Sequence, residues 1–264
     1  MTATAIALLA SAATDRKLAL EMARHLGLEL LTTTDIAAVN SDLKALVVMD
    51  GKRLSLQELG AKAPGPVAVD FGAAGMRHRR KGGQNELLGK AVGVLRKPGL
   101  TVLDATAGLG RDSFVLADLG CQVRLCEREL LIAALLESGL NRAAGGDSWL
   151  RDVTQRMRLH IGDARQLTAA QLQTCDVIYL DPMFPQRGKS AAVKKDMALF
   201  QRLLAPVGNE EDSERLLQWA LSQDVARVVV KRPLKAAYLA DRRPSHSISG
   251  KAVRFDVHVL RALN

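Results

Sequence analysis

A carboxylate, two prolines and a phenylalanine follow an apolar run in the segment CDVIYLDPMFP, residues 175–185. The run predicts a buried strand that ends at Asp181. The Asp181 carboxylate and the Pro182 carbonyl can both accept hydrogen bonds from an amine, and Phe184 can stack on the ring that carries it. The prolines restrict the loop, so little conformational entropy is left to lose on binding. The segment therefore predicts recognition of a flat base through its exocyclic amine.

An amine conjugated to a base is a poor nucleophile because its lone pair is delocalised into the ring. Hydrogen bonds from its N–H groups to Asp181 and Pro182 would draw the nitrogen toward tetrahedral geometry and direct the lone pair at an incoming carbon. Catalysis would then consist of alignment and electrostatics, without a covalent intermediate. We take Asp181, Pro182 and Phe184 as candidate catalytic residues. An isolated D-P-x-F is more often a strand-ending turn, so the interpretation depends on a second motif.

That second motif is the segment LDATAGLGRD, residues 103–112. Asp104 ends a strand, and Gly108 and Gly110 let the backbone approach a ligand at the start of a helix. Glu127 ends the next strand, where an acid can accept hydrogen bonds from both ribose hydroxyls. A dinucleotide fingerprint would need glycine at position 113, which is Ser113, and would begin closer to the strand. Both departures favour S-adenosylmethionine, whose cationic groups suit an acid-lined loop.

Further residues near these strand ends complete the predicted cofactor site. Backbone amides near Arg111 could take the methionine carboxylate, and Asp112 adds a second acid to the loop. Asp163 could accept from the adenine amine, with the Ala164 amide as donor to a ring nitrogen, or it could simply cap the following helix. Arg128 could lie over adenine or point into solvent. The predicted cofactor-binding residues are Asp104, Gly108, Gly110, Arg111, Asp112, Glu127, Arg128, Asp163, Ala164 and Asp181.

Alternating strand and helix patterns must position these residues. Apolar, β-branched runs predict strands at LTVLDA, CQVRLCE, MRLHIG, CDVIYL and ARVVVKRP, with helical stretches between them that include 191–204 and 213–222. SHSIS and RFDVHVL predict a closing antiparallel hairpin. This order is typical of an α/β fold with a doubly wound, mostly parallel, Rossmann-like sheet. In such sheets, ligands bind beyond the carboxyl ends of the strands.

The N-terminal part has a different pattern of apolar and polar residues. Short apolar runs, one helical stretch at 15–26 and the Asp-Gly pair in VVMDGKRLSL predict a small α+β unit with a hairpin. A glycine-rich, basic connector, GMRHRRKGGQNE, follows it. We therefore predict a small N-terminal α+β domain at residues 1–75 and a ligand-binding domain at residues 76–264.

Composition limits the class of protein. Apolar residues make up 48% of the 264-residue chain, which excludes disorder as the main state, and a net charge of +9 favours a polyanionic partner. Three cysteines without a CxxC pair predict reduced thiols in a cytoplasmic chain and no metal site. The early run TAIALLASAA is better interpreted as a strand than as a signal peptide, and no apolar run reaches transmembrane length.

Basic residues fall into three clusters along the chain. We expect all three near the carboxyl edge of the sheet, where an RNA backbone would pass, although any single charge is more often a solvated surface residue. The predicted RNA-contacting residues are His78, Arg79, Arg80 and Lys81 before the sheet, Lys189, Lys194 and Lys195 after the proline loop, and Lys231 and Arg232 at the end of the fifth strand.

Taken together, DATAGLGRDSFVLADLG, YLDPMFP, VKKDM and VVVKRP resemble the ribosomal RNA small subunit methyltransferase J family, as do VDF, HRRKGG, KAVG and RFDV. Met183 departs from the Asn/Asp-Pro-Pro-aromatic element of the wider amino-group methyltransferases but fits this family. The resemblance implies a class I S-adenosylmethionine-dependent enzyme that methylates the N2 amine of a guanosine in 16S rRNA. It implies cofactor contacts at Arg111, Asp112, Glu127, Arg128 and Asp181.

Other functions remain open at this point. The same fold could methylate a different nucleic acid, a protein or a small-molecule amine. A noncatalytic RNA-binding protein of ribosome assembly is a third possibility, and it would require no measurable cofactor affinity. A nicotinamide oxidoreductase is the most distant of the four, because Ser113 and the D-P-M-F loop disfavour it.

Overall fold

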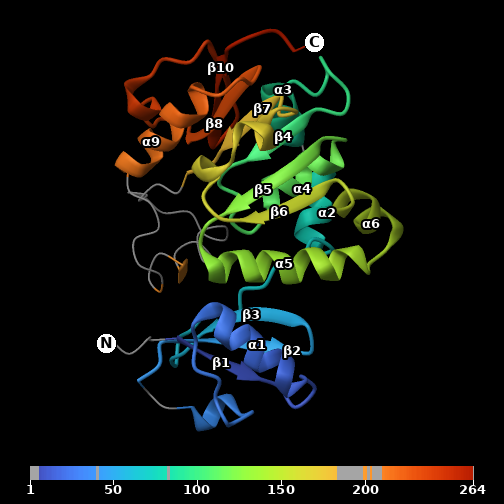
Figure 1. Cartoon of the computed structure of the whole chain (residues 1–264), viewed down its shortest axis with the longest axis vertical. Coiled ribbons are helices and arrows are strands. Elements are labelled where there is room, and N and C mark those ends of the chain that lie inside the picture. The colour runs from blue at the N-terminus through green and yellow to red at the C-terminus, as the bar shows by residue number, and fades with distance from the viewer. Residues whose placement is uncertain are drawn as a thin grey trace. The chain divides into compact units, whose positions relative to one another are not determined.

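The computed structural model describes residues 6–39, 42–81, 84–182, 199–200, 203 and 210–263. It contains two compact units (Figure 1). The first holds the residues up to Asp70 together with Ala134–Arg142, and the second holds Phe71–Ala133 and most of the chain after Ala143. The predicted α/β class and the small N-terminal α+β part are confirmed. The predicted domain boundary between residues 75 and 76 stays a prediction. The two compact units divide between Asp70 and Phe71.

The first unit is a three-stranded sheet with a helix. Strand β1 pairs in parallel with β2, and β2 pairs antiparallel with β3 through a turn in which Gly51 has φ of 57°. The predicted Asp-Gly hairpin is thus confirmed, and Asp15 caps the predicted helix α1. The elements are β1 (Ile6–Ala10), α1 (Arg16–Leu26), η1 (Ile36–Ala38), β2 (Ala45–Asp50) and β3 (Arg53–Glu58).

The second unit is built on a seven-stranded sheet of order β6-β5-β4-β7-β8-β10-β9. The five strands from β6 to β8 are parallel, and β10 runs antiparallel to both β8 and β9, as the sequence predicts. The winding direction reverses between β4 and β7. The strands are β4 (Thr101–Asp104), β5 (Gln122–Glu127), β6 (Met157–Ile161), β7 (Val177–Leu180), β8 (Arg227–Pro233), β9 (His246–Ser249) and β10 (Val253–Val259).

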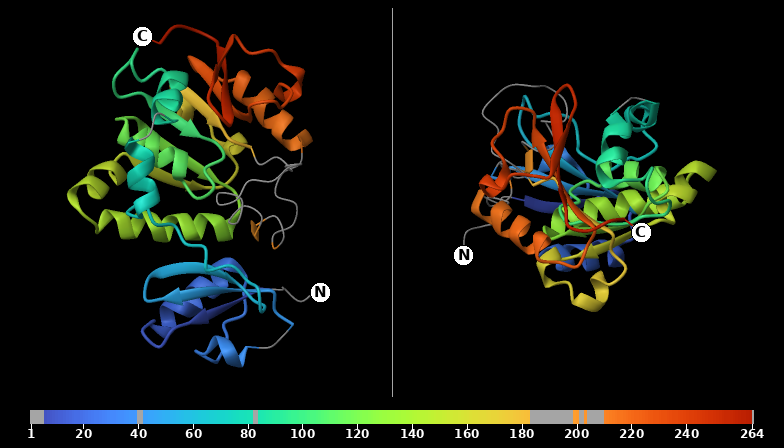
Figure 2. Two further views of the ribbon diagram at one scale, coloured as in Figure 1. Left: turned by 180° about the vertical axis from the view of Figure 1, so that it is seen from behind. Right: turned by 90° about the horizontal axis from the view of Figure 1, so that it is seen from above.

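Helices lie on both faces of this sheet, and Figure 2 shows them from behind and from above. The helices are α2 (Ala74–Lys81), α3 (Gln84–Val92), α4 (Arg111–Asp118), α5 (Leu130–Ala144), α6 (Ser148–Thr154), η2 (Ala164–Gln166), α7 (Ala169–Leu172), α9 (Glu210–Leu221) and η3 (Leu239–Asp241). The predicted helix at 213–222 corresponds to α9, whereas most of the predicted helix at 191–204 lies outside the described residues. None of the described helices is both long and apolar enough to cross a membrane.

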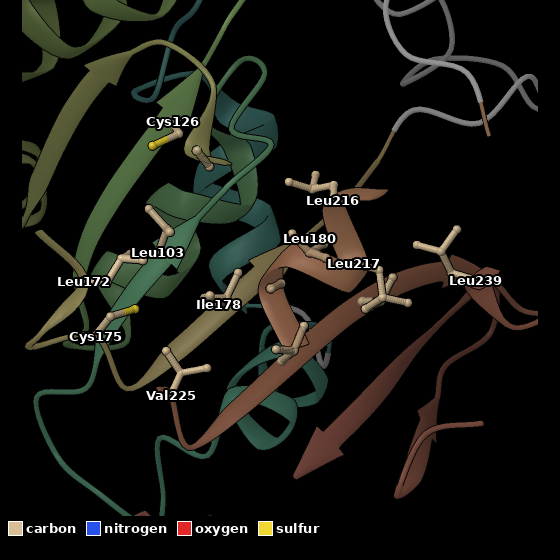
Figure 3. Close-up of a cluster of buried hydrophobic side chains, with 14 residues drawn as sticks. Leu103, Cys126, Leu172, Cys175, Ile178, Leu180, Leu216, Leu217, Val225 and Leu239 are labelled. Carbon is tan, nitrogen blue, oxygen red and sulfur yellow. The ribbon is translucent and has the colours of Figure 1, made fainter. Parts of the chain in front are cut away.

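The hydrophobic cluster beside α9 determines which side chains point toward the opposite face. Ile178 and Leu180 of β7 pack with Leu216 and Leu217 of α9 (Figure 3). Because side chains alternate along a strand, Tyr179 and the residue after Leu180 face the other way. Because Ile178 and Leu180 are buried on the α9 side of the sheet, the Asp181 side chain lies on the α4 side.

A stack of aromatic rings holds α4 in place. The Phe71 and Phe114 rings lie 4.6 Å apart and nearly parallel, and the Trp149 ring meets Phe114 edge to face at 5.4 Å. The Arg77 guanidinium lies 4.9 Å from the centre of the Trp149 ring. Since α4 starts at the glycine turn, these contacts fix the helix whose first turn faces the site.

Candidate active site

The glycine turn between β4 and α4 has the backbone that the sequence predicts. Gly108 and Gly110 have φ of 54° and 72°, the left-handed region that glycine adopts without a steric penalty. The Gly110 amide donates to the Ala107 carbonyl at 2.8 Å, and α4 begins at the next residue, Arg111. The turn brings the first turn of α4 to the carboxyl end of β4, beside the reversal of the sheet.

Asp104 organises this turn from within. Its side chain is 2% exposed, one oxygen accepts from the Thr106 amide at 3.1 Å, and the other accepts from the Ser113 hydroxyl at 2.5 Å. Burial raises the Asp104 pKa to about 7. The position where a dinucleotide fold needs glycine thus carries a serine that anchors the strand-end acid. Direct contact between Asp104 and the cofactor stays a prediction.

Glu127 connects the glycine turn to the end of β5. It accepts from the Gly108 amide at 2.8 Å with one carboxylate oxygen and from the Glu129 amide at 2.9 Å with the other. Burial raises the Glu127 pKa, and these two backbone hydrogen bonds oppose the rise. Each carboxylate oxygen can accept more than one hydrogen bond, so the geometry leaves the predicted ribose contact feasible.

Asp163 and Arg128 belong to a cluster of charges at the ends of β5 and β6. Asp163 caps η2 by accepting from the Arg165 amide at 2.9 Å and also pairs with the Arg165 guanidinium, so the capping alternative is confirmed. Arg128 donates to Asp212 of α9 at 2.7 Å, and Arg165 donates to the other Asp212 oxygen at 2.9 Å. The Arg128 guanidinium therefore forms an ion pair with Asp212. The sequence had suggested that Arg128 would lie over adenine or point into solvent, and it gave no sign of this pair. The adenine contacts of Asp163 and Ala164 stay predictions.

The proline loop begins at the reversal of the sheet. The Asp181 amide donates to Thr106 Oγ1 at 2.7 Å, which ties the start of the loop to the β4 end, and Pro182 is buried. The Asp181 side chain is 39% exposed, in contrast to the buried Asp104 and Asp112. Asp181 therefore presents its carboxylate outward beside the glycine turn. Phe184 lies outside the described residues.

Lys231 occupies the space between two predicted site acids. Its Nζ atom donates to Asp112 Oδ2 at 2.7 Å and to Asp181 Oδ2 at 2.8 Å. Tyr179 donates its hydroxyl to the same Asp112 oxygen at 2.7 Å. Lys231 was predicted to contact RNA phosphate, and the structure places its charge in an ion-pair network, because the end of β7 and the first turn of α4 each bring an acid to it.

Of the other predicted basic residues, the structure describes the side chains of His78 and Arg232. Arg232 is 4% exposed and donates to the Ala237 carbonyl, a buried position that does not support its predicted RNA contact. His78 is exposed on α2, but the adjacent Arg77 pairs with Asp147, in the connection that leads into the amino end of β6. The side chains of Arg79, Arg80 and Lys81 are not among those described, and Lys189, Lys194 and Lys195 lie outside the described residues.

Sequence reasoning missed several residues that shape the site. Tyr179 precedes Asp181 by two positions, and the period-two alternation of a strand could have placed both side chains on one face. Thr106 and Ser113 lie within the glycine motif, although no local signal identifies their partners. Asp212 comes from a distant helix. No signal in the sequence connects it to Arg128 and Arg165.

The chemistry of this site fits S-adenosylmethionine. Asp112 and Asp181 carry two negative charges and Lys231 one positive charge, so the exposed end of the network has an excess of negative charge suited to a sulfonium. The amides at the start of α4 can receive a carboxylate. Among the residues that the structure describes, no group of three or more His, Cys, Asp or Glu side chains is arranged to hold a metal ion. The three cysteines are buried and unpaired, and burial raises their pKa values, so they are packed as predicted.

Comparisons with known proteins agree with this site. The model of a SAM-dependent methyltransferase family matches residues 29–260. The ribosomal RNA small subunit methyltransferase J of Thioalkalivibrio sulfidiphilus is 48% identical, with 90% of this chain and 93% of that protein covered. The methyltransferase J of Pseudomonas aeruginosa is 47% identical, with 91% and 89% covered.

A solved structure shows the same fold over nearly the whole chain. The crystal structure of a SAM-dependent methyltransferase from Neisseria gonorrhoeae superimposes with a TM-score of 0.74 at 33% identity, covering 97% of each chain. The protein described here therefore belongs to the ribosomal RNA small subunit methyltransferase J family of S-adenosylmethionine-dependent methyltransferases.

Proposed function

We propose that this protein transfers a methyl group from S-adenosylmethionine to the exocyclic N2 amine of a guanosine in small-subunit (16S) rRNA. The observation that carries the proposal is the position of Asp181. Its amide is anchored to the glycine turn through Thr106, and its carboxylate faces outward at the reversal of the sheet. The relatives that resemble this chain over most of its length are named for the same class of substrate.

The Asp181 carboxylate and the Pro182 carbonyl bind the two N–H groups of the target amine. They direct the nitrogen lone pair toward the methyl carbon, and Phe184 stacks on the base, a contact worth roughly 1–3 kcal/mol. When bound, S-adenosylmethionine supplies the methyl group, and its carbon–sulfur bond breaks with the electron pair going to sulfur as the nitrogen–carbon bond forms. The methylated nitrogen then loses its proton to Asp181 or to water. The catalytic contribution of the protein is alignment in a fixed electrostatic environment.

The cofactor lies along the ends of β4, β5 and β6 in this proposal. Gly108, Gly110 and the amides at Arg111 receive its methionine part, and Glu127 accepts from its ribose. Asp163 and the Ala164 amide contact its adenine, next to Arg128. Asp104 and Asp112 hold the residues that make these contacts in place, because both carboxylates are buried and bonded to other side chains of the protein.

The RNA contacts are proposed for the predicted basic residues other than Lys231 and Arg232. These are His78, Arg79, Arg80 and Lys81 before the sheet and Lys189, Lys194 and Lys195 after the proline loop. Charge supports this assignment, since the chain carries a net charge of +9. We propose a cytoplasmic location for the protein, because ribosomal subunits are assembled there.

The test combines an activity assay with a binding assay. Asp181→Ala should lower methyl incorporation into small-subunit rRNA from a strain that lacks the enzyme by about 100-fold or more, while the protein stays folded. The control is Asp152→Ala, which removes an exposed acid from α6 and should leave the rate unchanged. Mapping the product should place the methyl group on a guanine N2.

Three results would contradict the proposal. A normal rate of methyl transfer in Asp181→Ala would contradict the proposed role of Asp181 in the mechanism. Labelled methyl groups that enter protein or small molecules, but not rRNA, would identify a different amine as the substrate. A wild-type protein that does not bind S-adenosylhomocysteine in a calorimetric titration would be a noncatalytic RNA-binding protein.

A further inference from the structure

Lys231 and Asp181 occupy equivalent places on two neighbouring parallel strands. The register of β7 and β8 pairs Val177 with Arg227 and continues to Leu180 with Val230. The next position along both strands therefore places Asp181 beside Lys231, and alternation turns both side chains toward the α4 face. The ion pair between them follows from this register. The two residues are 50 positions apart in the chain.

The lysine is enclosed by its partners, whereas Asp181 is the most open member of the network. The side chain of Lys231 is 21% exposed and that of Asp112 is 9% exposed, compared with 39% for Asp181. Asp112 is held in turn by the hydroxyl of Tyr179, which is completely buried two residues before Asp181. The network thus has a fixed inner end and a solvent-facing outer end.

The charges in this network depend on one another. Burial opposes the charge of Lys231, but the two carboxylates outweigh burial and raise the Lys231 pKa, so the side chain remains an ammonium. Burial also raises the pKa of Tyr179 well above its usual value, so its hydroxyl keeps the proton that it donates to Asp112. Two carboxylates this close would repel each other without a cation, and one of them would then take up a proton.

We propose that Lys231 is a positioning residue that holds the Asp181 carboxylate ionised and oriented to accept the N–H group of the target amine. The inference rests on the proposed function, in which Asp181 binds that amine. Lys231 anchors Oδ2 of Asp181, Asp112 anchors Lys231, and Tyr179 anchors Asp112. A neutral Asp181 would carry a proton of its own toward the amine, and it could neither accept that hydrogen bond as strongly nor take the product proton.

The experiment compares Lys231→Met and Lys231→Arg with a matched lysine, Lys97, whose acid partner lies at the other end of β7. Lys97 donates to Asp176 at 2.9 Å, one residue before β7 begins, while Asp181 comes one residue after β7 ends. The side chains of Lys97 and Asp176 are 34% and 15% exposed, so this pair is also partly buried. Lys97→Met thus removes a comparable ion pair far from the carboxyl edge.

Lys231→Met should lower kcat with saturating cofactor and rRNA by about 100-fold, because the acceptor of the amine is misplaced. Its affinity for S-adenosylhomocysteine, measured by calorimetry, should stay within about threefold of wild type. Lys231→Arg should recover part of the rate because it keeps the charge. Lys97→Met should lower the melting temperature without changing kcat.

A second readout does not depend on transfer to RNA. The carboxyl carbon of Asp181, identified in an NMR spectrum by its loss in Asp181→Asn, should titrate at higher pH in Lys231→Met than in wild type. Within the described part of the chain, the groups that face it are Asp104 from β4, Asp112 from α4, Tyr179 from β7 and Lys231 from β8. The Lys97→Met titration should match that of wild type.

Three outcomes would overturn the inference. An unchanged kcat in Lys231→Met, or an Asp181 titration that does not move, would show that the lysine does not set the state of this carboxylate. A large loss of S-adenosylhomocysteine affinity with kcat retained would show that Lys231 instead holds the methionine carboxylate of the cofactor. Wild-type protein that transfers no methyl group to rRNA would remove the proposed function, whereas the titration would still decide whether Lys231 controls Asp181.

Discussion

Asp104 and Asp181 follow neighbouring parallel strands, but their surroundings give the two carboxylates different tasks. Asp104 is 2% exposed and bonded to Ser113 and the Thr106 amide. Asp181 is bonded to Lys231 and has a 39% exposed side chain. A buried acid without a cationic partner is costly to ionise, whereas an acid next to an ammonium is not. Asp104 therefore supports the turn, and Asp181 is the one available to a substrate.

Asp104 predicts a specific dependence of stability on pH. Its pKa is raised from 3.8 to about 7 in the folded protein. Between these values the folded state binds more protons than the unfolded state, so this contribution to stability is complete below pH 4 and is lost as the pH rises through 7. We expect wild type to lose about 3 kcal/mol relative to Asp104→Asn between pH 4.5 and 8. Urea denaturation at both pH values measures this difference, and parallel pH curves for the two proteins would contradict it.

At the scale of elements, the glycine turn does more than connect a strand to a helix. It places the first turn of α4 over the strand ends, where Asp112 meets Lys231, and it receives the Glu127 side chain through the Gly108 amide. The turn has this shape because Gly108 and Gly110 adopt a left-handed backbone. Changes at these glycines should therefore affect cofactor binding more than stability alone would explain.

Gly110→Ala should cost about 1–2 kcal/mol of stability, because alanine is strained in the left-handed region. It should also weaken S-adenosylhomocysteine binding by about tenfold or more, about 1.4 kcal/mol, because the added Cβ hinders close approach of a ligand to the backbone of the turn. Gly99→Ala is the matched control, with φ of 67° and no atom within 4 Å of the added Cβ. It should show a similar loss in a denaturation curve and normal affinity in calorimetry. Equal affinity in both variants would argue against a cofactor role for the turn.

At the scale of the whole molecule, 37 lysine and arginine residues against 28 aspartate and glutamate residues give a net charge of +9. Binding of rRNA should release counterions, so its observed affinity should fall steeply, by about 100-fold or more between 50 and 200 mM salt. S-adenosylhomocysteine affinity should change little over the same range, because its site is formed by backbone amides and internally paired acids. Filter binding and calorimetry test the two expectations. A flat salt dependence for rRNA would contradict an RNA-binding surface built on these charges.

The sequence by itself determined the elements and the presence of the site. Strand periodicity predicted β4 to β8, the Asp-Gly pair predicted the β2–β3 hairpin, and two glycines predicted a turn whose φ values require them. These features depend on neighbours in the chain, so local patterns reveal them. Asp181 was identified for the same reason, because a carboxylate directly after a buried strand and before proline is a local signal.

Only the tertiary structure decided which charges meet. Lys231 and Asp112 are 119 positions apart, and Asp212 lies 84 positions from Arg128. Their pairing depends on strand order, register and the helix that covers each face, none of which is encoded in a short segment. This is why the sequence assigned Lys231 and Arg232 to RNA without showing the partners that the fold gives them. The fold places Lys231 between two acids and buries Arg232 against a carbonyl, because adjacent residues on a strand point to opposite faces.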